Sequence, residues 1–192
     1  LCSSPNQSLW RHFICDGDGE WIRRGLRLGS LMIVHDGSYI KEVDPTVCLA
    51  GFLIYYRTSR CWAKGPVAER TDSADNYRAE ILGALMIQLV LRTALGSHLP
   101  SARTVSISCD NKGVVSHGNA PARSLPDKQA QADVLRCFKR YLLDNQQSHR
   151  LDAEFFWVAS HQDDQKKWEH LTLEEKINVV VYGLAKDVLL AS

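Results

Sequence analysis

Hydrophobic residues dominate three successive segments in the first half of the chain, and short polar breaks separate them. The segments are LMIVHDGSYI, CLAGFLIYYRTS and CWAKGPVAER, which cover residues 31–40, 48–59 and 61–70. Apolar runs of this length between polar breaks are typical of strands, and breaks this short favour antiparallel hairpins. The pattern therefore predicts a three-stranded meander.

The next apolar stretch has the pattern of a long helix. Residues 75–95 are apolar on nearly every side, so we expect this helix to be central in the fold. Asp72, Ser73 and Asp75 are candidate N-terminal caps, and Gly96 is the expected C-terminal break.

The second half of the chain alternates between strand and helix patterns. We expect a strand over residues 104–110, a helical turn from Asn111, a helix over residues 127–145 and a strand over residues 153–160. The last helix starts near Thr172, which forms a capping-box pattern with Glu175. The predicted order is therefore β-β-β-α-β-α-α-β-α.

The bulk composition is that of one globular domain. Of 192 residues, 45% are hydrophobic and 23% are charged, which suits a full core. The formal net charge of +1 gives no global attraction to nucleic acid, so polyanion binding would need a local basic patch.

The six cysteines show no CxxC spacing, and we expect them to be reduced. The sequence has neither a membrane-length apolar run nor a secretory leader, which predicts an intracellular protein, cytoplasmic or nuclear and not secreted. Because the chain begins with Leu1, we expect a domain of a longer polypeptide.

Three carboxylates stand in or beside the apolar runs. Asp36 lies inside the first run, Glu80 opens the helical run EILGALMIQLVL, and Asp110 ends the segment TVSISCD. A carboxylate in apolar surroundings is costly unless it is paired or binds a metal. None of the residues three or four positions from Glu80, which are its neighbours on a helix surface, is cationic. We therefore expect one cation-binding cluster, whose oxygen ligands favour Mg²⁺ or Mn²⁺ over zinc.

Five segments resemble, in order, motifs of the ribonuclease H family, particularly the domain attached to reverse transcriptases of retroelements. They are HDGSY, DNYRAEILGAL, SCDNKGV, WVASH and LTLEEKINVVVYGLAK. The resemblance implies an α/β ribonuclease H-like fold over residues 31–192. Its five-stranded mixed sheet has three antiparallel strands and then two parallel ones, flanked by helices. Residues 1–30 are irregular and rich in glycine and charge, and we expect an N-terminal extension or linker.

The resemblance also implies an activity, the metal-dependent cleavage of the RNA strand of an RNA/DNA hybrid. It makes Asp36, Glu80 and Asp110 catalytic ligands of two Mg²⁺ or Mn²⁺ ions in the substrate complex. It makes His161 the catalytic loop histidine, which assists proton transfer or product departure. It further implies a covalently linked polymerase domain. The positions that it places near the RNA strand are Gly37, Ser38, Asn76 and Asn111.

The last helix departs from the family pattern at the fourth carboxylate, where this chain has Tyr182. Asp187 lies five residues on, about 140° round the helix at roughly 100° per residue, and cannot simply substitute. Asn178 lies one turn from Tyr182 and can offer a neutral oxygen ligand. Asp163 and Asp164, in the long preceding loop, are either replacement ligands or solvated charges. Loss of one carboxylate should weaken the second metal site.

Simpler explanations exist for single residues. Asp110 alone would equally fit a cap of the following turn, and His161 would equally fit a solvated loop residue. Tyr182 is either a site residue or an aromatic that packs beside the apolar stripe. Trp157 is expected in the core.

Two other functions stay open. Tyr182 in place of a carboxylate suits a catalytically degenerate scaffold or hybrid-binding domain beside a polymerase. A different nuclease of the same superfold, such as an integrase or exonuclease, is also compatible, because fold does not fix function. The loop between the middle helices is short, so we expect no basic protrusion that grips the hybrid.

Overall fold

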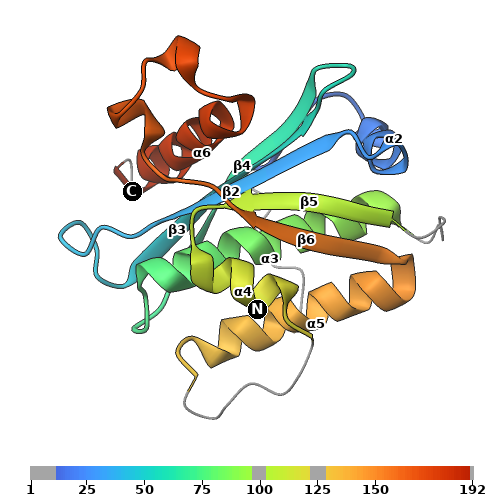
Figure 1. Ribbon diagram of the computed structural model, residues 1–192. Coiled ribbons are helices and arrows are strands. Elements are labelled where there is room, and N and C mark those ends of the chain that lie inside the picture. The colour runs from blue at the N-terminus through green and yellow to red at the C-terminus, as the bar shows by residue number, and fades with distance from the viewer. Residues whose placement is uncertain (1–11, 97–102, 122–128, 191–192) are drawn as a thin grey trace.

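The structure is a computed structural model, and it describes residues 12–96, 103–121 and 129–190 (Figure 1). One mixed sheet forms its centre, with the strand order β1-β4-β3-β2-β5-β6. Strands β1 to β4 pair antiparallel, whereas β5 pairs parallel with both β2 and β6. The strands are β1 (Ile14–Cys15), β2 (Leu31–Ser38), β3 (Val47–Tyr56), β4 (Cys61–Arg70), β5 (Arg103–Cys109) and β6 (Leu151–Trp157).

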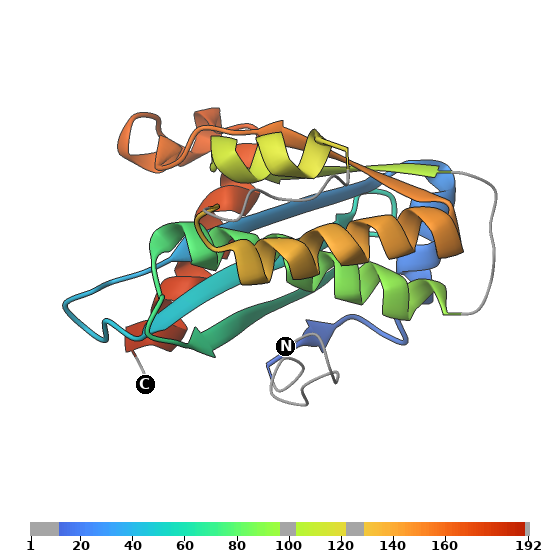
Figure 2. The ribbon, with the colours of Figure 1, turned by 90° about the horizontal axis from the view of Figure 1, so that it is seen from below.

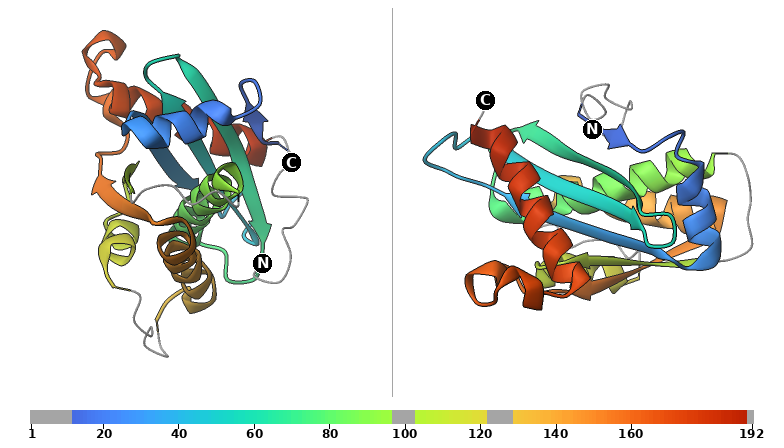
Figure 3. Two further views of the ribbon diagram at one scale, coloured as in Figure 1. Left: turned by 90° about the vertical axis from the view of Figure 1, so that its right-hand side faces the viewer. Right: turned by 90° about the horizontal axis from the view of Figure 1, so that it is seen from above.

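Helices cover both faces of this sheet (Figures 1 and 2). Helices α3, α4 and α5 lie on one face, and α6 crosses β2 and β3 on the other (Figure 3). Two short 3₁₀ turns, η1 and η2, connect β6 to α6. The bounds are α2 (Glu20–Leu28), α3 (Asn76–Leu95), α4 (Lys112–Asn119), α5 (Ala132–His149), η1 (Gln162–Asp164), η2 (Trp168–His170) and α6 (Leu173–Leu190).

Strand β2 is buried along nearly its whole length because both of its faces are covered. Ile33 belongs to the large core beneath α3 and α5, whereas Val34 packs with Ile177 and Val181 of α6. Successive side chains of a strand point to opposite faces. Asp36 follows Val34 by two residues and so shares the face that α6 covers.

The two ends of α3 and the start of α6 confirm the capping predictions. Of the three candidate caps of α3, Asp75 is the one used, and its carboxylate accepts a hydrogen bond from the Arg78 N–H at 2.6 Å. At the other end Gly96 follows the last helical residue. At α6, Thr172 and Glu175 exchange backbone-to-side-chain hydrogen bonds of 2.8 and 3.2 Å, which is a capping box.

The N-terminal segment differs from the expectation of irregular structure. Residues 14–28 contain β1, which adds a sixth strand at the edge of the sheet, and the amphipathic helix α2. The apolar side of α2 joins the large core through Ile22 and Leu26, and Trp21 stacks on Tyr56 with ring centroids 6.4 Å apart. The division of the chain at residue 30 stays a prediction.

The cysteines differ in part from the expectation. Cys15, Cys48, Cys61 and Cys109 are free, but Cys137 is disulfide-bonded, so the prediction of a reduced thiol is wrong there. The absence of a CxxC spacing does not exclude a disulfide. The prediction for Cys2 lies outside the described residues.

Within the described ranges, none of the helices combines the length and the apolar composition that crossing a membrane requires.

Candidate metal centre

Asp36, Glu80 and Asp110 meet at one point of the structure. Asp36 lies near the end of β2, Glu80 in the second turn of α3, and Asp110 directly after β5. Each offers a carboxylate oxygen, and these oxygens all lie within 4.8 Å of one another. The sequence prediction that three separate elements build one acidic cluster therefore agrees with the geometry.

The strand register brings the two aspartates together. Strands β2 and β5 are parallel neighbours, and Val34 of β2 is paired with Ser108 of β5. Asp36 and Asp110 each stand two residues further along. The two carboxylates therefore leave the same edge of the sheet side by side.

Two glycines let α3 come close enough to β2 to add the third carboxylate. A Cβ atom on Gly37 would lie 2.7 Å from the Glu80 backbone nitrogen, and one on Gly83 would lie 2.9 Å from His35 Nδ1. Both contacts are shorter than a side chain tolerates. Glycine at these two positions is therefore a condition for placing Glu80 beside Asp36.

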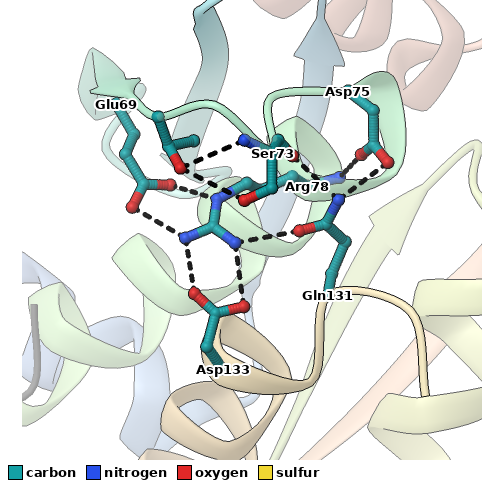
Figure 4. A network of polar contacts seen from close by, with 7 residues as sticks. Glu69, Ser73, Asp75, Arg78, Gln131 and Asp133 are labelled. Carbon is teal, nitrogen blue, oxygen red and sulfur yellow. Dashed lines mark hydrogen bonds and ion pairs between the residues drawn. The ribbon is translucent and has the colours of Figure 1, made fainter. Parts of the chain in front are cut away.

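A buried arginine fixes the first turn of α3, two residues before Glu80 (Figure 4). The Arg78 guanidinium, 3% exposed, binds Glu69 of β4 at 2.6 and 2.9 Å and Asp133 of α5 at 2.7 and 2.9 Å. It also donates to Gln131, whose amide donates to Asp75 at 2.8 Å. Strand β4 and the N-terminal turns of α3 and α5 are thereby tied together.

The three carboxylates repel one another with little water to screen them. Asp36 is 4% exposed and Glu80 is 1% exposed. Burial, and then the charge of Asp110, raise the pKa of Asp36 to about 8. Burial, and then the charges of Asp36 and Asp110, raise the pKa of Glu80 well above its usual range. Burial also raises the pKa of Asp110.

These properties fit a divalent cation. Glu80 Oε2 is buried and has no hydrogen-bond partner among the described residues. An ion held by all three carboxylates would supply that partner and neutralise the mutual repulsion.

A histidine that the sequence reasoning did not select lies behind the cluster. His35 is fully buried, its Nδ1 is 3.8 Å from Glu80 Oε2, and neither ring nitrogen has a hydrogen-bond partner among the described residues. Burial lowers the pKa of His35 to about 3, so the imidazole is neutral. Its signal in the sequence was a second polar residue, next to Asp36, inside an apolar strand.

His161 lies at the rim of the cluster and faces Tyr182 of α6. Their ring centroids are 5.0 Å apart and the ring planes meet at 80°. Burial is the main influence that raises the pKa of Asp110, and the electrostatic influence of the nearby His161 acts in the opposite direction. His161 therefore lies near the acidic cluster, and Tyr182 contacts His161.

Comparison with models of protein families finds no match, and comparison with curated proteins finds none. Solved structures do match. RNase H1 of the halophilic archaeon Halobacterium salinarum NRC-1 has a TM-score of 0.54 at 12% identity, over 84% of this chain and 98% of that one. The prototype foamy virus protease–reverse transcriptase has a TM-score of 0.60 at 14% identity, over 82% of this chain and 20% of that one. LC11-RNase H1 in complex with an RNA/DNA hybrid has a TM-score of 0.53 at 14% identity, over 82% and 94%.

The chain has the ribonuclease H fold. The predicted fold class is confirmed, with β1 as a sixth strand added to the edge of the expected sheet. The acidic cluster stands at the carboxyl ends of two parallel strands of this fold, which is where open α/β sheets commonly build their sites.

The four positions expected near an RNA strand differ in their surroundings within the ribonuclease H fold. Gly37 lies under α3, and Ser38 is buried beside it. Asn76 is exposed at the start of α3. The Asn111 side chain caps α4 by accepting hydrogen bonds from the N–H groups of the second and third residues after it, at 2.9 and 3.2 Å. Their role in binding stays a prediction.

The candidate replacement ligands, and Asp187, which was not expected to substitute, differ in their exposure. Asp163, Asp164 and Asp187 are exposed, and none belongs to the acidic cluster, the only such group found among the described residues. Asn178 of α6 is 3% exposed, and its Oδ1 has no hydrogen-bond partner among them. Of the four, Asn178 alone has a buried oxygen free for a ligand.

Trp157 corrects the expectation of a core position, because 49% of it is exposed. It ends β6, which is the outer strand of the sheet, while Phe155 of the same strand is buried. The indole N–H donates to the Asp110 carbonyl at 2.8 Å, and Lys112 Nζ lies 4.8 Å from the ring centroid. Trp157 therefore supports the metal-centre loop from outside.

Proposed function

We propose that this chain is a metal-dependent endonuclease that hydrolyses the RNA strand of RNA/DNA hybrids. The observation that carries the proposal is the cluster of Asp36, Glu80 and Asp110, with oxygens within 4.8 Å of one another, in a ribonuclease H fold. The solved complex of LC11-RNase H1 with an RNA/DNA hybrid supports the choice of substrate.

Mg²⁺ or Mn²⁺ is the proposed cofactor, because hard divalent cations prefer oxygen ligands. We expect two ions in the substrate complex, and when bound they supply activation of the attacking water and stabilisation of the leaving oxygen. The chain itself contributes concentrated negative charge in a nearly dry site. His161 at the rim moves a proton or assists product departure, and Asn178 is the candidate neutral ligand.

Gly37, Ser38, Asn76 and Asn111 are the proposed substrate-binding residues. Backbone N–H groups and short polar side chains suit contacts with phosphates and 2′-hydroxyls. The formal net charge of +1 provides little long-range attraction. A covalently linked polymerase domain, of the kind present in the foamy virus protease–reverse transcriptase, is therefore proposed to supply the rest of the grip in a retroelement polyprotein.

A cleavage assay on end-labelled hybrid, run in Mg²⁺ and in Mn²⁺, tests the proposal. We expect the parent chain to cut the RNA strand, Asp110→Asn to abolish cutting, and Asp72→Asn, at an exposed aspartate, to cut like the parent. Duplex DNA and single-stranded RNA run in parallel should stay intact. Preferential cutting of either would indicate another nuclease of the same superfold. A silent parent chain would refute the proposal.

A second candidate function is a non-catalytic hybrid-binding scaffold, and the observation that favours it is Tyr182. A tyrosine supplies no negative charge for a second ion. If the parent chain binds hybrid without cutting it and Tyr182→Asp creates cleavage, the scaffold is the better description. Robust cleavage by the parent rejects it.

A further inference from the structure

We propose that Tyr182 is a positioning residue that holds the His161 imidazole at the rim of the metal centre. The proposal rests on the proposed nuclease function for its catalytic consequence, but the contact itself is independent of activity. It assigns a role to the position at which the chain departs from the ribonuclease H pattern.

The backbone on either side of His161 is fixed, so the side chain has a defined origin. The Val158 N–H donates to the Cys109 carbonyl at 2.9 Å, which ties the loop to the end of β5. Gln162 is buried, and its carbonyl accepts hydrogen bonds from residues 165 and 166 at 3.1 and 2.9 Å. His161 itself has φ of +51°, a left-handed conformation that a non-glycine residue adopts only where its surroundings impose it.

The surface that His161 meets is equally fixed. Val181 and Ala185 of α6 are fully buried, and the Val181 carbonyl contacts β3 so closely that only Gly51 fits beneath it. Tyr182 is therefore held on a helix that cannot slide over the sheet. Its ring meets the imidazole edge-to-face with centroids 5.0 Å apart, a favoured geometry for a pair of aromatic rings.

The contact between Tyr182 and His161 can influence the acidic cluster through His161. The electrostatic influence of His161 reaches the Asp110 carboxyl, and the Tyr182 ring meets the His161 ring, so Tyr182 is linked to the acidic cluster through His161. A carboxylate at position 182 would add charge to the metal centre. Tyrosine places an aromatic ring there instead. This ring holds the exposed loop histidine in one orientation.

Two variants separate the ring of Tyr182 from its hydroxyl. Tyr182→Phe keeps the ring, whereas Tyr182→Leu removes it at similar bulk. The first measurement is the imidazole proton chemical shift of His161, recorded without metal or substrate and assigned with His161→Gln. We expect a ring-current shift that Tyr182→Phe retains and Tyr182→Leu loses. Val180→Leu, at an exposed position on the same helix, should leave the shift unchanged.

The second measurement is hybrid cleavage. Tyr182→Leu should lower kcat by about tenfold with little change in KM, because it disturbs a group that acts during the chemical step. Tyr182→Phe should restore most of the activity. In a double-mutant cycle, Tyr182→Leu should add little to the loss caused by His161→Ala, since both remove the same contribution.

Each measurement can overturn a different statement. An unchanged His161 shift in a folded Tyr182→Leu variant overturns the proposed contact. If Tyr182→Leu lowers kcat by the same factor in the presence and in the absence of His161→Ala, the positioning role is overturned. A parent chain that cuts no hybrid refutes the proposed nuclease function instead, and the imidazole shift then decides the contact alone.

Discussion

At the scale of single residues, the protein carries a cluster of carboxylates whose ionised form is unfavourable, and either protonation or a bound cation relieves the repulsion. Asp36 and Glu80 are almost completely buried, and their carboxylates share one site with Asp110. When carboxyl groups lie this close together and are shielded from water, their ionisation costs free energy in the folded state. The residues suited to metal binding are therefore residues that destabilise the metal-free fold.

This cost predicts how the stability of the metal-free protein depends on pH. The pKa of Asp36 is about 8 in the folded state, above its ordinary value of 3.8, so the folded state binds more protons than the unfolded state between these values. Its stabilising contribution is complete below pH 4 and is lost as the pH rises through 8. Urea denaturation in EDTA should show a falling free energy of unfolding from pH 5 to pH 8.

Replacing the charge should remove this loss. We expect Asp36→Asn at pH 8 without metal to be more stable than the parent by on the order of 1–3 kcal/mol. Added Mg²⁺ or Mn²⁺ should stabilise the parent but not the variant. Equal pH slopes for parent and variant would show that Asp36 is not the group responsible.

The hydrogen bond from Trp157 to the Asp110 carbonyl gives a second prediction for a single residue. Trp157→Phe keeps an aromatic ring on an exposed site but removes the indole N–H. We expect a loss of about 0.5–1.5 kcal/mol in the free energy of unfolding and reduced hybrid cleavage, because the backbone that carries Asp110 is less firmly held. Trp168→Phe, at another exposed tryptophan, should change neither the stability nor the cleavage. If it has a similar effect, the hydrogen bond of Trp157 does not explain the loss.

At the scale of elements, the clamp formed by Arg78 joins β4, α3 and α5. Arg78 is buried, and its partner Glu69 is mostly so, with 14% of its side chain exposed. Removing one partner of a buried ion pair leaves the other uncompensated. We expect Arg78→Met to lower the free energy of unfolding by about 3–5 kcal/mol in urea denaturation.

An exposed ion pair is the matched control for this clamp. Arg92 and Asp144 link α3 to α5 at 3.2 Å, but both side chains are more than a third exposed. Exposed pairs contribute about 0–1 kcal/mol, so Arg92→Met should have a small effect. If both variants lose the same stability, burial does not explain the strength of the Arg78 clamp.

The elements also show how far the sequence alone can lead. Periodicity predicted β2, α3 and α6, because each has a long apolar pattern and recognisable caps such as Asp75 and Thr172. It did not predict α2, whose nine residues include Gly25 and bury one narrow stripe. Trp157 was assigned to the core because a strand pattern does not reveal which strand lies at the edge of the sheet.

The same limit applies to the metal centre. The three carboxylates were predictable, since each conflicts with an apolar pattern in its own segment. The neutral His35 behind Glu80 and the contact between His161 and Tyr182 were not, because they depend on how α3 and α6 cross the sheet. The distances between elements are set by tertiary packing, which a local sequence pattern does not encode.

At the scale of the whole molecule, the metal centre depends on α3 and α6, which pack against opposite faces of one sheet. Gly37 lets α3 approach β2 on one face, and Gly51 lets α6 approach β3 on the other. Asp36 is paired with Gly51, and Gly37 with Ala50, so both close approaches lie next to the first carboxylate in the sheet. The positions of Glu80, Asn178 and Tyr182 therefore depend on the spacing of the layers.

This dependence predicts opposite results for two glycine-to-alanine substitutions near α6. Gly51→Ala would place a Cβ atom against the Val181 carbonyl, so the helix must move outward at a cost of about 1–3 kcal/mol. The movement of α6 should also abolish the ring-current shift of His161.

Gly183→Ala, on α6 itself, meets no atom within 4 Å and should raise the free energy of unfolding by about 0.5–1 kcal/mol. Thermal denaturation with the His161 shift checks both, and a tolerated Gly51→Ala would show that the layers do not need this close contact.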